Sequence, residues 1–139
     1  MAGAEFLDTN ILVFAYDASD PKKQSIAQDL TRRALAGEFT ISVQVLSEFA
    51  STLLHKISPP ATPEQLVTIL DALAPIKTIS PDQETVRRAV GVRGAYGLHF
   101  YDAMIIAAAE RASCARVWSE DLNPGQQYFG VSVENPFAK

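Results

Sequence analysis

The chain has 139 residues, of which 47% are hydrophobic and 20% charged, so its length and composition suit one ordinary globular domain with a sizeable core. Its formal net charge of −4 argues against a basic nucleic-acid coat protein, and its single cysteine excludes an intrachain disulfide. No apolar run reaches the roughly 18 residues that predict a membrane span. The first residues lack the basic and then apolar order of a signal peptide, so we expect a cytoplasmic protein with no membrane partner.

Hydrophobic periodicity and turn residues divide the chain into alternating strands and helices. In chain order we expect a strand over 4–7, helices over 11–16 and 22–36, a strand over 38–42, helices over 43–57 and 64–73, a strand over 76–79, helices over 80–93 and about 100–109, and strands over 115–118 and 131–133. This alternation favours one domain over residues 1–139, with a three-layer α/β/α fold and a mostly parallel central sheet.

Capping residues suggest several of these boundaries. Ser42 is a plausible cap for the helix over 43–57. Ser80 is expected to cap the helix over 80–93, with Pro81 at its first helical position. Gly97 interrupts the pattern just before the apolar helix, so we expect that helix to begin near Phe100.

Four acidic residues occupy related positions in this pattern. Asp8 follows the first strand and Asp121 follows the strand over 115–118, while Glu48 and Asp102 lie early in helices. The carboxyl ends of parallel strands meet at one edge of a sheet, where α/β folds bind their ligands. Each acid also has a purely structural interpretation: Asp8 as a helix cap, Asp102 as a partner of the helix dipole, and Glu48 as a solvated side chain.

Gathering four carboxylates carries an electrostatic penalty. Two charges about 4 Å apart repel by roughly 1 kcal/mol in water and about 4 kcal/mol at an effective dielectric constant of 20. Four carboxylates therefore require either protonation or cations between them. Carboxylate oxygens suit hard ions, so Mg²⁺ or Mn²⁺ is the expected partner, and the two histidines and one cysteine have no zinc-binding spacing.

The motifs around these acids resemble those of PIN-domain ribonucleases, specifically the VapC-type toxins of toxin–antitoxin pairs. The matching segments spread over nearly the whole chain: 6–12 (FLDTNIL), 46–49 (LSEF), 98–105 (LHFYDAMI) and 119–122 (SEDL). The resemblance implies a PIN-like fold and makes Asp8, Glu48, Asp102 and Asp121 the acidic metal site. It also implies that Thr9 or Asn10 and Ser119 orient water or a metal ion.

Two details of the resemblance stay open. Glu120 is adjacent to Asp121, so either acid of the pair could face the metal site. His99 stands where relatives commonly carry a small polar residue; it could touch substrate, and we favour a role as the cap of the following helix.

The activity that the resemblance implies is Mg²⁺-dependent hydrolysis of RNA phosphodiesters, leaving a 5′ phosphate and a 3′ hydroxyl. The RNA target could be a tRNA or an rRNA. The resemblance also implies a cognate antitoxin protein, whose peptide covers an apolar groove and blocks the site, and a homodimer.

Because acids repel RNA, cations must contact its phosphates. The candidates are Lys22, Lys23, Arg87, Arg88 and Arg93, each of which has a solvated surface position as its alternative.

Two other classes of protein are considered. A receiver-like phosphoacceptor domain needs an adjacent acidic pair after the first strand and a lysine after a late strand, and Glu5, Asp8 and Arg116 do not supply them. A catalytically silent PIN fold acting as a binding module is disfavoured because all four acids are present.

Overall fold

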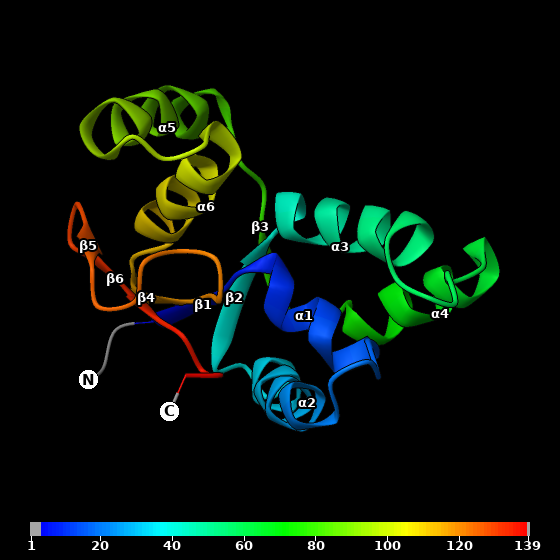
Figure 1. Ribbon diagram of the computed structural model, residues 1–139. Helices are drawn as coiled ribbons and strands as arrows, with labels where there is room; N and C mark the ends of the chain where they lie inside the picture. Colours follow the sequence, from blue (N-terminus) through cyan, green and yellow to red (C-terminus); the bar gives the residue numbers. More distant parts are fainter. Residues whose placement is uncertain (1–3, 139) are drawn as a thin grey trace.

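The computed structural model describes residues 4–138 and contains a six-stranded sheet (Figure 1). The strands follow one another in the order β3-β2-β1-β4-β6-β5, and the pairs are parallel except for the antiparallel pair of β5 and β6. The mostly parallel sheet predicted from the sequence is therefore confirmed. The strands are β1 (Ala4–Leu7), β2 (Phe39–Ser42), β3 (Lys77–Ile79), β4 (Cys114–Trp118), β5 (Gln127–Tyr128) and β6 (Val131–Glu134).

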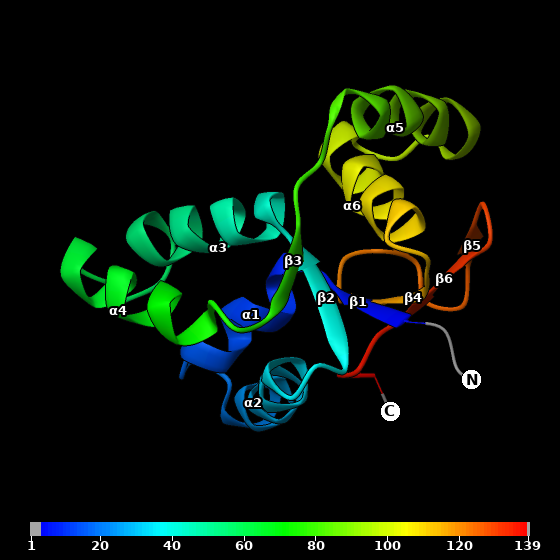
Figure 2. The ribbon, with the colours of Figure 1, turned by 180° about the vertical axis from the view of Figure 1, so that it is seen from behind.

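Helices cover both faces of this sheet. Those of the described residues are α1 (Thr9–Tyr16), α2 (Pro21–Leu35), α3 (Val43–His55), α4 (Pro63–Leu73), α5 (Gln83–Tyr96) and α6 (Phe100–Arg111). Figures 1 and 2 show α5 and α6 on one side of the sheet and α1 and α2 on the other, with α3 and α4 extending together as an arm. None of the helices in residues 4–138 is both long enough and apolar enough to cross a membrane.

Helix α6 is the most deeply buried helix because it lies between the sheet and α5. Its residues from Ala103 to Ala109 are all buried, and it packs on β4, β6 and α5. The small alanine side chains let the helix approach its neighbours closely, while Met104, Ile105 and Ile106 fill the remaining space. This packing fixes the position of the first turn of α6, which carries Asp102.

The central strands end at the same level of the sheet. In the parallel pair of β1 and β4, Leu7 is opposite Trp118, and the backbone N–H of Asp8 donates to the carbonyl of Trp118 at 3.0 Å. The neighbouring strand β2 ends at Ser42, whose hydroxyl accepts a 3.3 Å hydrogen bond from the N–H of Val45 and so caps α3. The segments that follow these strands therefore emerge at one edge.

Most boundaries differ by one or two residues from those predicted from the sequence, and the larger differences concern α5 and β5. Helix α5 is capped by Asp82 rather than Ser80, because Asp82 and Thr85 form a reciprocal capping box. The same helix continues through Gly94 to Tyr96 and ends at Gly97, whose φ of 69° gives a left-handed cap. Strand β5 was not predicted, since two residues are too few to show a period.

Candidate active site

The edge where β1, β2 and β4 end bears a pocket of about 640 Å³. Its lining includes Asp8 from the end of β1, Glu48 from α3, Asp102 from α6 and Asp121 from the segment after β4. The structure thus brings together the four acids that lie as many as 113 positions apart in the chain, counting from Asp8 to Asp121. They converge because parallel strands deliver their carboxyl ends, and the helices that follow them, to one edge.

Asp8 is the most buried of the four, with 4% of its surface exposed. Its Oδ1 accepts a 2.7 Å hydrogen bond from the N–H of Thr9, and its Oδ2 accepts a 2.7 Å hydrogen bond from the hydroxyl of Ser119. Burial nevertheless raises the pKa of Asp8 from 3.8 to about 6, and the negative charges of Asp121 and Asp102 act in the same direction. The two hydrogen bonds oppose this rise and hold the carboxyl in a fixed orientation.

Asp121 is positioned by Asn10 and Ser119. The side-chain N–H of Asn10 donates to Oδ2 of Asp121 at 3.1 Å, and the hydroxyl oxygen of Ser119 accepts from the backbone N–H of Asp121 at 3.1 Å. The neighbouring Glu120 also lines the pocket, but its carboxylate forms an ion pair with Lys23. Asp121 is therefore the acid of this pair that is hydrogen-bonded into the cluster around Asp8.

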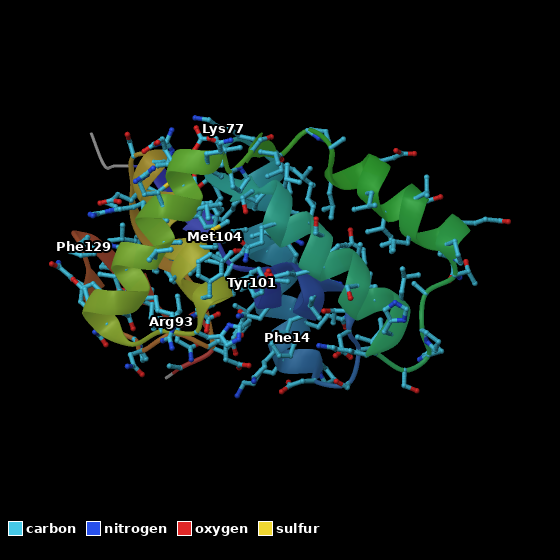
Figure 3. The ribbon with its side chains drawn as sticks, turned by 90° about the horizontal axis from the view of Figure 1, so that it is seen from above. Phe14, Lys77, Arg93, Tyr101, Met104 and Phe129 are labelled. Carbon is cyan, nitrogen blue, oxygen red and sulfur yellow. The ribbon has the colours of Figure 1, made fainter. Side chains whose placement is uncertain are left out.

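Glu48 is held from both sides. The hydroxyl of Thr9 donates to its Oε1 at 2.6 Å, and the side-chain N–H of Gln44 donates to its Oε2 at 3.3 Å. The same amide nitrogen of Gln44 donates to the carbonyl of Tyr101 at 3.0 Å, which ties α3 to the first turn of α6. Figure 3 shows Tyr101 on α6 beside α3. Glu48 is half-buried in the pocket rather than fully solvated.

Asp102 lies in the first turn of α6 and is half-buried. Burial raises its pKa, the charges of Asp121 and Glu48 raise it further, and His99 lowers it. His99 caps the helix, since its Nδ1 accepts a 3.3 Å hydrogen bond from the N–H of Tyr101. The structure therefore gives His99 the capping position that the sequence analysis favoured.

The donor chemistry of the pocket fits a hard divalent cation. Carboxylate oxygens are the ligands that Mg²⁺ and Mn²⁺ prefer. The charge of Asp121 raises the pKa values of both Asp8 and Asp102, which shows that these carboxylates lie within electrostatic reach of one another. Within residues 4–138, no group of three or more His, Cys, Asp or Glu side chains is arranged to hold a metal ion as it stands. A bound ion would therefore draw these carboxylates closer together.

The cations singled out in the sequence lie outside the pocket lining. Lys23 pairs with Glu120, Arg88 with Glu110 and Arg87 with Glu84, while Arg93 donates to the carbonyl of Leu98 at 2.8 Å. Lys22 lies in the first turn of α2.

Sequence reasoning missed two charged residues that do line the pocket, Asp17 and Lys56. Asp17 follows the last residue of α1, and Lys56 follows the last residue of α3. A signal for Lys56 exists in the sequence: Glu48, Thr52 and Lys56 are spaced by four residues and so share one face of a helix.

A second, mostly apolar pocket of about 600 Å³ adjoins the acidic one. It lies between the end of α1, the end of α3 and α4, with Tyr16, Leu53 and Ile69 among its lining residues. Asp17 and Ile57 line both pockets, so the two hollows are neighbours on the surface.

Comparisons with known proteins agree with this architecture. The family model described as PIN domain matches residues 6–127. A DNA-bound VapBC structure from Salmonella typhimurium is similar at a TM-score of 0.71 and 17% identity, covering 98% of this chain and 99% of the other. A toxin–antitoxin complex from Klebsiella pneumoniae gives a TM-score of 0.69 and 20% identity, with coverage of 96% and 98%.

A third solved structure is the VapC20 toxin of Mycobacterium tuberculosis, described as cleaving the sarcin–ricin loop. It is similar at a TM-score of 0.64 and 16% identity, covering 85% of this chain and 92% of that one. A search among curated proteins gave no match.

Proposed function

Because this chain belongs to the PIN domain family, we propose that it is a metal-dependent endoribonuclease and the toxin of a toxin–antitoxin pair. The observation that carries the proposal is the convergence of Asp8, Glu48, Asp102 and Asp121 on one pocket at the carboxyl edge of the sheet. The family match also removes the receiver-like alternative.

The four carboxylates would hold Mg²⁺ or Mn²⁺. Such an ion, when bound, lowers the pKa of water and stabilises the charge of the leaving oxygen during phosphodiester hydrolysis. The chain's own residues orient the carboxylates toward the pocket, since Ser119 and the N–H of Thr9 hold Asp8, Asn10 holds Asp121, and the hydroxyl of Thr9 holds Glu48. Both histidines lie outside the pocket lining, so the proposed hydrolysis assigns no proton transfer to a histidine.

The proposed partner is a cognate antitoxin. Its support is the apolar pocket formed by α1, α3 and α4, which adjoins the acidic one, together with a shared fold with solved toxin–antitoxin complexes. A peptide seated in the apolar pocket would extend past Asp17 and Ile57 and obstruct access to the acids. We further propose a homodimer that acts in the cytoplasm, where its tRNA or rRNA substrates reside.

Purified protein incubated with total RNA tests the proposal. We expect cleavage with Mg²⁺ or Mn²⁺, no cleavage in EDTA, and RNA ends that carry a 5′ phosphate and a 3′ hydroxyl. Asp8→Asn and Asp102→Asn should each abolish cleavage. Asp71→Asn is the matched control, because Asp71 is an exposed acid of α4 that does not line the pocket.

Cleavage by both site variants at the parental rate would exclude this pocket as the active site. A parent that cuts no RNA with either ion would instead favour the catalytically silent binding module. Sequencing of RNA ends after the protein is induced in a host without its antitoxin would identify the target.

A further inference from the structure

The acidic pocket has an uneven distribution of charge. Six acids line it, namely Asp8, Asp17, Glu48, Asp102, Glu120 and Asp121. Among the described residues, Lys56 is the one lysine or arginine in that lining. The pocket therefore has a negative part around the sheet edge and a single positive charge at the end of α3.

Lys56 differs from most other cations of the chain in having no carboxylate partner within residues 4–138. Lys23, Arg32, Arg33, Arg87, Arg88 and Arg111 each form an ion pair. The side chain of Lys56 is exposed and makes no hydrogen bond in the described part of the chain, although many acids line the same pocket. Its charge is available to a ligand.

The position of Lys56 relative to the acids follows from helix geometry. Glu48 and Thr52 of α3 and its C-cap Lys56 lie in one line, at intervals of about one helical turn, and the backbone N–H of Lys56 donates to the carbonyl of Thr52. Eight residues at about 1.5 Å each place the α carbon of Lys56 about 12 Å along the helix axis from that of Glu48. Ser51 also lines this stretch and is an exposed residue. A strand whose cleaved phosphate lies among the acids would thus have a flanking part of its backbone near Lys56.

We propose that Lys56 binds a backbone phosphate of single-stranded RNA on one side of the cleaved bond. This inference rests on the proposed nuclease function. It sets the path of the RNA strand across the acidic pocket, with the scissile phosphate at the acids and a flanking phosphate at the end of α3. RNA is favoured over an acidic peptide because Lys56 shares its pocket with the carboxylates that the scissile phosphate must reach.

Salt dependence of binding tests this role. Cleavage is silenced by Asp102→Asn in every protein, and a short fluorescein-labelled single-stranded RNA of mixed sequence is titrated in Mg²⁺. Loss of one phosphate contact should reduce the slope of log K against log salt by about 0.7. Over roughly 50 to 200 mM salt, the protein with Lys56 should therefore lose about threefold more affinity than the Lys56→Ala protein.

Two variants serve as controls. Lys56→Arg keeps the charge and should keep the slope. Lys77→Ala removes an exposed lysine of β3 that forms no ion pair with the residues the structure describes. Lys77 lies at the opposite side of the molecule from Phe14 of the acidic pocket (Figure 3), so this variant should also keep the slope. If Lys56 interacts only with the negative end of the α3 dipole, Lys56→Ala should lower thermal stability and leave the slope unchanged.

Replacing one phosphate of the RNA at a time by a neutral methylphosphonate identifies the phosphate that Lys56 contacts. At the linkage that Lys56 contacts, Lys56→Ala should have no further effect on affinity, whereas at other linkages its effect should persist. Equal slopes for the parent and Lys56→Ala, with RNA bound by both, would overturn the inference and leave the nuclease proposal standing. Absence of RNA binding and of cleavage by the unmodified protein would overturn both.

Discussion

Replacing Asp8 by asparagine should make the protein more stable at neutral pH while removing its activity. The reason is the buried position of this carboxyl, whose pKa rises from 3.8 to about 6 on folding. A carboxyl that binds its proton more tightly in the folded state stabilises the fold only while it is protonated. That contribution is complete below about pH 4 and is lost as the pH rises through about 6.

The magnitude follows from the same two values. A rise from 3.8 to about 6 corresponds to about 3 kcal/mol of lost stability once both states are ionised. Asparagine keeps the oxygen that accepts from Thr9, but the hydroxyl oxygen of Ser119 already accepts from the backbone N–H of Asp121 and so offers the new amide no free acceptor. Leaving the new amide N–H without a partner costs about 1 kcal/mol. We therefore expect Asp8→Asn to gain about 2 kcal/mol near pH 8.

Urea unfolding in EDTA at about pH 4 and about pH 8 measures the effect. The difference between Asp8→Asn and the parent should be small at the acidic pH and about 2 kcal/mol at the alkaline pH. Mg²⁺ at roughly 100 times its dissociation constant should stabilise the parent by about 2.7 kcal/mol, which exceeds the gain expected for Asp8→Asn and makes the parent the more stable protein by under about 1 kcal/mol. A difference that does not change with pH would refute the idea that burial of the Asp8 charge destabilises the fold.

Three other substitutions distinguish residues that orient Glu48 from a residue that only stabilises the fold. Thr9→Val removes the hydroxyl that donates to Glu48, and kcat should fall roughly tenfold, equivalent to about 1.4 kcal/mol, with the melting temperature nearly unchanged. Gln44→Leu removes the amide that links Glu48 to α6 and should raise the Mg²⁺ concentration needed for half-maximal cleavage; an unchanged requirement would argue against that positioning role. Arg88→Ala breaks a bidentate ion pair with Glu110 and should lower the free energy of unfolding by about 1 kcal/mol. Because Arg88 lies outside the pocket, the cleavage rate should be unaffected. A slower rate would instead support contact between Arg88 and RNA.

The sequence predicted the sheet well because its strands are apolar and alternate with long amphipathic helices. It was less successful where two local signals compete. Both Ser80 and Asp82 are good caps, and the choice between them depends on Thr85, three residues after Asp82. Strand β5 forms because it pairs antiparallel with β6 across a turn at Gly130, whose φ is 86°. The two residues of β5 are too few to show the alternation that predicts a strand.

The acids of the candidate site were accessible to sequence reasoning because Asp8 and Asp121 follow strands and Asp102 begins a helix, while Glu48 lies in the first half of a helix that leaves a strand. Thr9 and Ser119 were predicted as neighbours that orient water or a metal ion, and their hydrogen bonds to Glu48 and Asp8 became visible only in the structure. Gln44 was missed as a partner of Glu48 because its role depends on the position of α6 relative to α3. Lys56 was missed because periodicity identifies the exposed face of α3 without showing what lies opposite that face.

The same architecture explains how the chain can gather so many carboxylates. Helices α1, α3 and α6 all begin at this edge of the sheet, and each helix N-terminus carries about half a positive charge. Asp8 caps α1 and Asp102 lies in the first turn of α6, so both are close to such a charge. Glu48 begins the second turn of α3, where the influence of the helix dipole has declined. Its carboxylate is oriented instead by Thr9 and Gln44, which is why loss of either partner should affect Glu48 more than loss of a helix cap would.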